Sequence, residues 1–194
     1  MKLSADLVCA SPDGWIETVL ENFDAFLLDH ADCERKASAM VMSFIARYPD
    51  RVEIIPELID TAIEELEHFQ QVYKIMEEKG LRLPERMKED GYVKQLLKSC
   101  RTGRDERFID RMLWASVIEC RGAERFRMVY QNLPQGALKK FYHELWASEA
   151  KHGHLFVKML LNYFDEKPIY QRLDELVAIE AKVLQSLPLR PALH

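Results

Sequence analysis

The pattern Glu-x-x-His occurs twice in the sequence, as Glu65 to His68 and as Glu149 to His152. Residues i and i+3 of a helix lie on one face, so each pair can present a carboxylate and an imidazole to the same metal ion. Each match alone is weak evidence, because a chain this rich in glutamate produces such pairs by chance. Evidence for a metal site therefore has to come from the residues around these pairs.

A further glutamate precedes each pair by nearly the same interval. Glu34 lies 31 residues before Glu65, and Glu119 lies 30 residues before Glu149. Each interval corresponds to one helical leg, a turn and a returning leg, so both glutamates of a hairpin are expected at a similar depth. Two hairpins that each carry one Glu and one Glu-x-x-His form the arrangement of a two-metal carboxylate site in a helical bundle.

The helical faces around these glutamates are otherwise apolar. Glu65 shares its face with residues such as Leu58 and Val72, whereas Glu64, one position away, shares its face with charged residues such as Asp60. An unpaired buried carboxylate costs several kcal/mol, so four of them require a strong counter-charge. Mixed carboxylate and imidazole ligands suit iron or manganese. The predicted ligands of this two-metal site are Glu34, Glu65, His68, Glu119, Glu149 and His152.

The apolar periodicity predicts long helices connected by few turns. The expected helices cover residues 15–48, 56–79, 105–132, 137–164 and 170–187, with a short one at 92–99 inside the connection 80–104. Two hairpins joined by one long crossover are typical of the ferritin-like four-helix bundle. We therefore predict an all-α fold of this kind with an additional C-terminal helix, in one domain spanning residues 1–194.

The composition is typical of a globular protein with few turns. The 194 residues are 48% hydrophobic and 30% charged, and they include only 7 Gly and 8 Pro. The four cysteines form no Cys-x-x-Cys pair, which argues against a disulfide framework and against a cysteine-built metal site. No apolar run is long enough for a signal peptide or a membrane span. We expect a cytoplasmic protein with no membrane association.

Charge is distributed unevenly along the chain. The net charge of −5 gives no support to nucleic-acid binding over the whole surface. Residues 79–111, however, contain ten basic and six acidic side chains, so this segment carries +4 and the remainder −9. The segment is either a solvated connection of mixed charge or a surface for an anionic partner.

Several residues near the predicted ligands have a simpler interpretation. His30, one turn before Glu34, is expected to be a capped or partly exposed histidine, with support of a ligand as the alternative. Ser38 and Ser116 are spaced so that they could hydrogen-bond ligands, and Tyr142 is expected to pack in the core. Glu180 interrupts the apolar stripe of the last helix, which predicts a salt bridge to a neighbouring helix.

Three segments resemble the bacterial tRNA 2-methylthio-N6-isopentenyladenosine hydroxylases, a family of the ferritin-like superfamily. The first is residues 28–38, which read Leu-Asp-His-Ala-Asp-Cys-Glu-Arg-Lys-Ala-Ser. The second is residues 64–69, followed by 76–80. The third is residues 118–126, with Glu-Arg-Phe after Glu119, followed by 140–142 and 148–152. The resemblance covers nearly the whole chain. Where the family pattern reads Glu-Ala-Arg-Ser-Cys-Glu-Arg-Phe, this chain has Glu-Cys-Arg-Gly-Ala-Glu-Arg-Phe, a difference that leaves the ligand in place.

The resemblance implies a di-iron monooxygenase that hydroxylates the isopentenyl side chain of a modified adenosine next to the tRNA anticodon. Its cofactors would be two iron ions, cycling between Fe2+ and Fe3+, with O2 as co-substrate. The chain has no flavin motif and no cysteine cluster, so electrons would come from a separate donor such as a ferredoxin or a reductase. The protein would be a monomer or a small homo-oligomer.

The resemblance also indicates where tRNA would bind. The basic crossover is the candidate for phosphate contacts, and an apolar channel would receive the prenyl group, although its aromatic residues could equally be core. The predicted substrate-binding residues are Lys94, Lys98, Arg101, Arg104, Phe126 and Phe156. Arg121, Arg125 and Arg127 would either line an approach for the phosphates or form salt bridges on the helix surface.

Two other classes of function are compatible with the residues. A ferritin-like ferroxidase or a peroxidase would use the same metal ligands to handle iron or peroxide instead of tRNA. A non-catalytic helical adaptor would bind no stoichiometric metal, and the four carboxylates on apolar faces argue against it.

Overall fold

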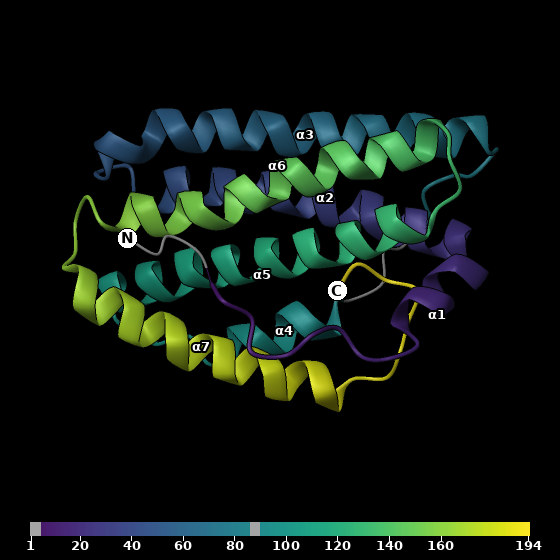
Figure 1. Cartoon of the computed structure of the whole chain (residues 1–194). Helices are drawn as coiled ribbons and strands as arrows, with labels where there is room; N and C mark the ends of the chain where they lie inside the picture. The colour runs from purple at the N-terminus through teal and green to yellow at the C-terminus, as the bar shows by residue number, and fades with distance from the viewer. Residues whose placement is uncertain (1–4, 86–89) are drawn as a thin grey trace. The chain divides into compact units, whose positions relative to one another are not determined.

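The computed structural model describes residues 5–85 and 90–194, and every regular element in this part of the chain is a helix. Figure 1 shows them in chain order. They are α1 (Trp15–Glu21), α2 (Phe23–Arg47), the short 3-10 helix η1 (Val52–Ile54), α3 (Ile55–Glu78), α4 (Gly91–Leu97), α5 (Arg104–Asn132), α6 (Ala137–Leu160) and α7 (Glu166–Ser186). Arg86 and Lys88, which contribute to the predicted basic segment, lie outside the described residues, as do residues 1–4.

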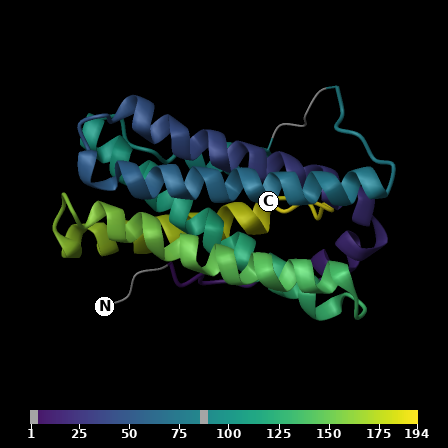
Figure 2. The same cartoon turned by 90° about the horizontal axis from the view of Figure 1, so that it is seen from above.

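The chain forms two compact units, and the unit that contains α2 and α3 comprises residues 17–89 and 190–193. These two helices run antiparallel and lie side by side in both views (Figures 1 and 2). Apolar residues at helical spacing, such as Val41 of α2 and Val72 of α3, are buried. Gly80 ends α3 with φ 72°, and the next N–H, from Leu81, donates to the Met76 carbonyl, as in a glycine-terminated helix.

The other unit comprises residues 1–16, 90–189 and 194. Its main hairpin pairs α5 with α6, and both α7 and α4 pack on α5 (Figure 1). Its core is rich in aromatic side chains, among them Phe108 and Trp114 of α5 and Phe156 of α6. Asp90 caps α4, because its carboxylate accepts a hydrogen bond from the Val93 N–H.

The first long helix is interrupted, which differs from the expectation of one helix over residues 15–48. Asn22 has φ −129° and ψ 43°, and it separates α1 from α2. Its side-chain amide donates to the Thr18 carbonyl at 3.0 Å. Asparagine competes in this way for backbone hydrogen bonds, so a single residue breaks a helix whose apolar pattern continues on both sides.

The boundaries of the last two helices also differ from the expectation. α6 ends at Leu160 instead of residue 164, and α7 begins at Glu166 instead of residue 170. Pro168 was expected to precede α7, but it lies within its first turn, where a proline is tolerated because the missing N–H has no helical partner.

Within the described residues, no helix is both long enough and apolar enough to cross a membrane.

Candidate metal centre

The α2–α3 hairpin brings together Glu34, Glu65 and His68. One ligand atom from each lies within 4.8 Å of the other two, and the three residues are 1% to 8% exposed. His68 Nδ1 lies 3.6 Å from Glu65 Oε2 and 3.8 Å from Glu34 Oε2. Glu64 is exposed, as its polar face predicted. The register of α3 that points Glu65 and His68 into the protein is therefore confirmed.

His30 supports this group of ligands directly. Its side chain is fully buried, and its Nε2 lies 2.7 Å from Glu34 Oε1. The interpretation of His30 as a capped or partly exposed histidine is therefore wrong. The two residues are four apart on α2, so the helix itself places the imidazole over the carboxylate. A ring held in this position fixes the orientation of Glu34, the role that outer-shell partners have at metal sites.

The α5–α6 hairpin brings together Glu119, Glu149 and His152 in the same way. One ligand atom from each lies within 4.8 Å of the other two, and the residues are 2% to 7% exposed. His152 Nδ1 lies 3.3 Å from Glu149 Oε2. Each hairpin therefore contains one Glu and one Glu-x-x-His with converging, buried ligand atoms, as the two nearly equal intervals in the sequence predicted.

A serine next to each set of ligands joins the two helices of its hairpin. Ser38 of α2 donates to the Ala62 carbonyl of α3 at 2.8 Å, and Ser116 of α5 donates to the Gly153 carbonyl of α6 at 2.5 Å. Both had been considered as hydrogen-bond partners of ligands. Their hydroxyls instead bond to the backbone of the opposite helix within one turn of a ligand, so they fix the register in which the ligands face each other.

α5 and α6 are closely packed beside the ligands. A Cβ atom added to Gly153 would lie 2.6 Å from Cys120 Sγ, whereas its other neighbours, Cys120 N and Ser116 O, would be at an ordinary 3.7 Å. Gly153 follows His152 and Cys120 follows Glu119. A side chain at this position would therefore push apart the two helices that position the ligands.

We expect Gly153→Ala to destabilise the protein by about 1–3 kcal/mol, the usual cost of overpacking a core, and to lower iron content. Removing Cys120 Sγ relieves the only short contact, so Gly153→Ala with Cys120→Ala should recover most of both losses. Urea unfolding and iron analysis of both variants and of Cys120→Ala alone provide the measurement. If the second substitution restores nothing, the thiol contact is not the cause.

A second buried polar cluster surrounds Arg121, two residues after Glu119. Its guanidinium donates through Nε to Glu180 Oε1 at 2.9 Å and through Nη2 to Glu180 Oε2 at 3.1 Å, and both side chains are fully buried. Nη1 donates to Glu124 at 2.6 Å, and Nη2 also donates to the Cys9 carbonyl at 2.9 Å. The Tyr92 hydroxyl donates to Glu180 Oε1 at 2.8 Å. The predicted salt bridge of Glu180 is confirmed, with α5 as the neighbouring helix.

The electrostatics of this cluster follow from burial and pairing. Burial alone would lower the pKa of Arg121, but the hydrogen bonds and charge of Glu180 outweigh it, so the net shift is upward. Burial, followed by the charge of Glu180, raises the pKa of Tyr92 well above its usual value. Arg125 donates to Ser11 Oγ at 3.0 Å and lies 4.7 Å from the Trp15 ring centre. Burial lowers its pKa to about 10.

These contacts correct the expectation for the arginines after Glu119. Arg121 and Arg125 are buried and hold the segment of residues 9–15, so they do not line an approach for phosphates. Arg121 instead forms salt bridges with Glu180 and with the partly exposed Glu124. Arg127 is exposed and lies 5.4 Å from the Trp146 ring centre. The contact with the N-terminal segment gives no signal in the sequence, because its partners are more than 100 residues apart.

The predicted substrate-binding residues lie in different environments. Lys94, Lys98 and Arg104 are exposed. Arg101 is partly exposed, but its guanidinium is hydrogen-bonded to Asp110. Phe126 and Phe156 are fully buried in the unit formed by α4 to α7, and the Phe126 ring lies 5.8 Å from that of Tyr142. Tyr142 is therefore a core residue, as expected, and the assignment of the others to substrate binding stays a prediction.

The donor atoms of both sets fit iron. Carboxylate oxygens and imidazole nitrogens are ligands that suit iron, and Glu with Glu-x-x-His on facing helices is the ligand pattern of ferritin-like di-iron proteins. The ligand atoms of each set already converge to within 4.8 Å of one another in the protein. The buried Glu and His side chains are thus placed for iron binding.

The helices and the two sets of ligands define the class as a ferritin-like carboxylate and histidine metalloprotein. Comparison with solved structures supports this class. The chain matches a structure titled "Protein 43 with aldehyde deformylating oxygenase activity", from Synechococcus, with a TM-score of 0.90 and 31% sequence identity over 98% of this chain and 93% of that one. The predicted all-α, ferritin-like fold is confirmed.

The sequence comparisons identify the family. The family model described as tRNA-(MS[2]IO[6]A)-hydroxylase (MiaE) matches residues 2–194, and the chain belongs to this family. A tRNA 2-(methylsulfanyl)-N(6)-isopentenyladenosine(37) hydroxylase from Pseudomonas putida is 34% identical over 95% of this chain and 89% of its own length. A protein of the same name from Salmonella typhimurium is 27% identical over 75% of this chain and 72% of its own length. The protein is therefore an enzyme of a hydroxylase family, as the motifs predicted.

Proposed function

We propose that this protein hydroxylates the isopentenyl side chain of 2-methylthio-N6-isopentenyladenosine next to the anticodon of tRNA, at a terminal methyl group. The observation that carries the proposal is the pair of buried Glu and Glu-x-x-His sets in a member of this hydroxylase family. The two sets would act within one ferritin-like domain of residues 1–194. The family match does not favour a ferroxidase or a peroxidase.

The six residues would hold two iron ions. Glu34, Glu65 and His68 are the ligands from one hairpin, and Glu119, Glu149 and His152 are those from the other. When bound, the iron pair supplies activation of O2, so that one oxygen atom enters a C–H bond and the other is reduced to water with externally supplied electrons and protons.

Other residues of the chain hold the proposed ligands and their helices in position. His30 holds the Glu34 carboxylate through its contact at 2.7 Å, so this ligand keeps one orientation when the metal charge changes. Ser116 and the Gly153–Cys120 contact hold α5 and α6 in register at the other set. Apolar side chains such as Phe126 and Phe156 exclude water from the interior beside these ligands, which protects the oxidising chemistry from side reactions.

The proposed partners follow from this chemistry. The substrate is the anticodon loop of a tRNA, whose unstacked bases can be turned out toward a pocket. The described residues contain no cysteine pair spaced for an iron–sulfur cluster, so we infer that a ferredoxin or a reductase supplies electrons. A tRNA substrate places the reaction in the cytoplasm, and the proposed enzyme is a monomer or a small homo-oligomer.

Nucleoside mass spectrometry tests this proposal. Isopentenylated, methylthiolated tRNA is incubated with iron-loaded protein, a reductant and O2, then digested to nucleosides. We expect the modified adenosine to gain the mass of one oxygen atom, and we expect no gain without O2 or without iron. An unchanged nucleoside, with two irons per chain and electron supply both verified, would contradict the proposed reaction and favour iron or peroxide handling.

A further inference from the structure

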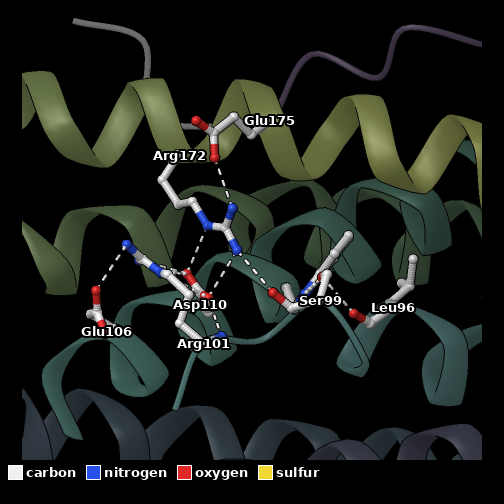
Figure 3. Close-up of polar contacts among 8 residues, drawn as sticks. Leu96, Ser99, Arg101, Glu106, Asp110, Arg172 and Glu175 are labelled. Carbon is white, nitrogen blue, oxygen red and sulfur yellow. Dashed lines mark hydrogen bonds and ion pairs between the residues drawn. The ribbon is translucent and has the colours of Figure 1, made fainter. Parts of the chain in front are cut away.

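The loop between α4 and α5 is fixed by a buried carboxylate, Asp110 of α5. The Arg101 backbone N–H donates to Asp110 Oδ2 at 2.8 Å, and the Arg101 guanidinium donates to both carboxylate oxygens. Arg172 of α7 donates to the same two oxygens at 2.9 Å and to the Ser99 carbonyl at 3.0 Å (Figure 3). Trp114 Nε1 donates to Ser99 Oγ at 3.2 Å. Ser99 and Arg101 of the loop are thus bound to α5 and α7.

This arrangement joins two guanidinium groups to one carboxylate. Asp110 is fully buried, and the hydrogen bonds from Arg172 and Arg101 lower its pKa in spite of the opposing effect of burial. The outer sides of the arginines face two exposed carboxylates, Glu175 at 2.7 Å from Arg172 and Glu106 at 3.8 Å from Arg101 (Figure 3). Bidentate pairs of this kind fix geometry as well as charge. The loop is therefore held in one conformation before any ligand binds.

Exposed cations flank this fixed loop. Lys94 and Lys98 precede it, and Arg104 and Arg107 follow it in the first turn of α5. Only two exposed acids, Asp105 and Glu106, lie in the same stretch. Cations held on a rigid loop bind phosphates at a lower entropic cost than cations on a mobile one.

A hollow of about 300 Å³ lies beside the loop, at the turn between α6 and α7. Arg101, Tyr163, Phe164 and Asp165 contribute to its lining. The Tyr163 and Phe164 rings meet edge to face, with centroids 6.4 Å apart, and the buried Phe108 ring packs against Phe164 at 6.3 Å. Aromatic faces, a carboxylate acceptor and a guanidinium are the groups with which proteins bind an unstacked nucleotide.

We propose that this loop and hollow form an RNA-docking surface that binds a nucleotide of the substrate tRNA other than the one that is hydroxylated. The inference rests on the proposed function for the identity of the RNA. Ile109, which also lines the hollow, precedes Glu119 by ten residues of α5, or about 15 Å along the helix axis. At about 3.4 Å per stacked nucleotide, this separation corresponds to four or five nucleotides. The surface would orient the anticodon arm while the modified base enters the metal site.

The effect of Asp110→Asn on RNA affinity distinguishes this proposal from binding by charge attraction alone. Asp110→Asn removes a negative charge, so a purely electrostatic surface would bind RNA more tightly after the substitution. If the fixed loop matters, the same substitution weakens binding, because Arg101 and Arg172 lose the carboxylate that holds them, and Arg172 in turn holds the Ser99 carbonyl. We expect about 5- to 10-fold weaker tRNA binding.

The experiment measures tRNA affinity by fluorescence anisotropy across a salt series, using iron-loaded protein and unmodified tRNA, so it requires no catalysis. We expect Arg107→Glu to weaken binding about 10-fold and to reduce the salt slope by about one phosphate contact. Tyr163→Ala should weaken binding about 10-fold with an unchanged slope, because stacking is lost but no charge. Lys140→Glu is the matched control, since Lys140 is 78% exposed near the start of α6, about 30 Å along that helix from its end beside the hollow.

Iron content and thermal unfolding confirm that each variant is folded, and Arg172→Gln provides a second test of the loop if Asp110→Asn does not fold. Wild-type affinity for Arg107→Glu and Tyr163→Ala, or equal losses for Lys140→Glu, would overturn the docking surface. Tighter binding by Asp110→Asn would overturn the role of the fixed loop. The proposed function can fail while the docking surface stands. In that case the wild-type protein binds tRNA through this surface but does not modify its nucleosides.

Discussion

Replacing Glu119 by Ala should remove iron from at least one position of the proposed pair and lower hydroxylation by more than about 100-fold. Loss of an outer-shell partner alone typically costs 10- to 100-fold at metal sites, so loss of a ligand should exceed that range. Glu64→Ala is the matched control, because Glu64 is exposed on α3 next to the buried Glu65. Iron quantification and nucleoside analysis of both variants provide the measurement.

Glu119→Ala should make the iron-free protein more stable than the iron-free wild type, and it should reduce the stability that iron binding adds. Without metal, Glu119→Ala removes one of several buried carboxylates, so the apo-variant should be more stable than the apo-wild type by about 1 kcal/mol or more. With iron, the wild type gains stability by binding the metal, and the variant should gain less. Equal loss of iron in Glu119→Ala and Glu64→Ala would mean that the proposed ligand set is wrong.

Replacing Arg121 by Ala should remove a large part of the free energy of unfolding of the protein. The substitution leaves the fully buried Glu180 without its bidentate cation and removes the donor to the Cys9 carbonyl. Breaking a buried ion pair in this way typically costs about 3–5 kcal/mol. The total free energy of unfolding of a domain is only about 5–15 kcal/mol. Urea unfolding of the iron-free protein measures the loss without a contribution from metal binding.

A variant without the buried charges separates the two causes of that loss. Arg121→Met combined with Glu180→Leu and Tyr92→Phe removes the cation, the carboxylate and the hydroxyl that donates to it. Because Glu180 is then no longer left buried without its cation, we expect most of the lost stability to return. If this variant is as unstable as Arg121→Ala, the loss comes from the contact with the N-terminal segment instead.

Much of the candidate site could be predicted because helical periodicity is local. Each predicted ligand occupies the apolar face of its own helix, and the structure buries all six while it leaves Glu64 exposed. The similar intervals between Glu34 and Glu65 and between Glu119 and Glu149 predicted that the ligands of each hairpin meet, and they do. Periodicity and spacing carry this information without any knowledge of tertiary contacts.

The features that could not be predicted depend on contacts between distant residues or on single-residue geometry. Arg172 reaches Asp110 across 62 positions, and Arg121 reaches Glu180 across 59. The sequence predicted that Glu180 forms a salt bridge, but it did not identify Arg121 as the partner. Asn22 breaks a helix whose apolar pattern continues on both sides. His30 was misjudged because a histidine one turn from a carboxylate can be exposed or buried, depending on packing that spacing does not determine.

The origin of the inserted oxygen atom shows whether the protein activates O2. The iron-loaded protein is supplied with reductant, modified tRNA and O2 carrying a heavy oxygen isotope, in ordinary water, and the nucleosides are analysed by mass spectrometry. We expect the hydroxylated adenosine to carry one heavy oxygen atom, and we expect this product to be absent with Glu119→Ala. A hydroxyl oxygen derived from water, or equal product from Glu119→Ala, would contradict oxygen activation at the proposed metal centre.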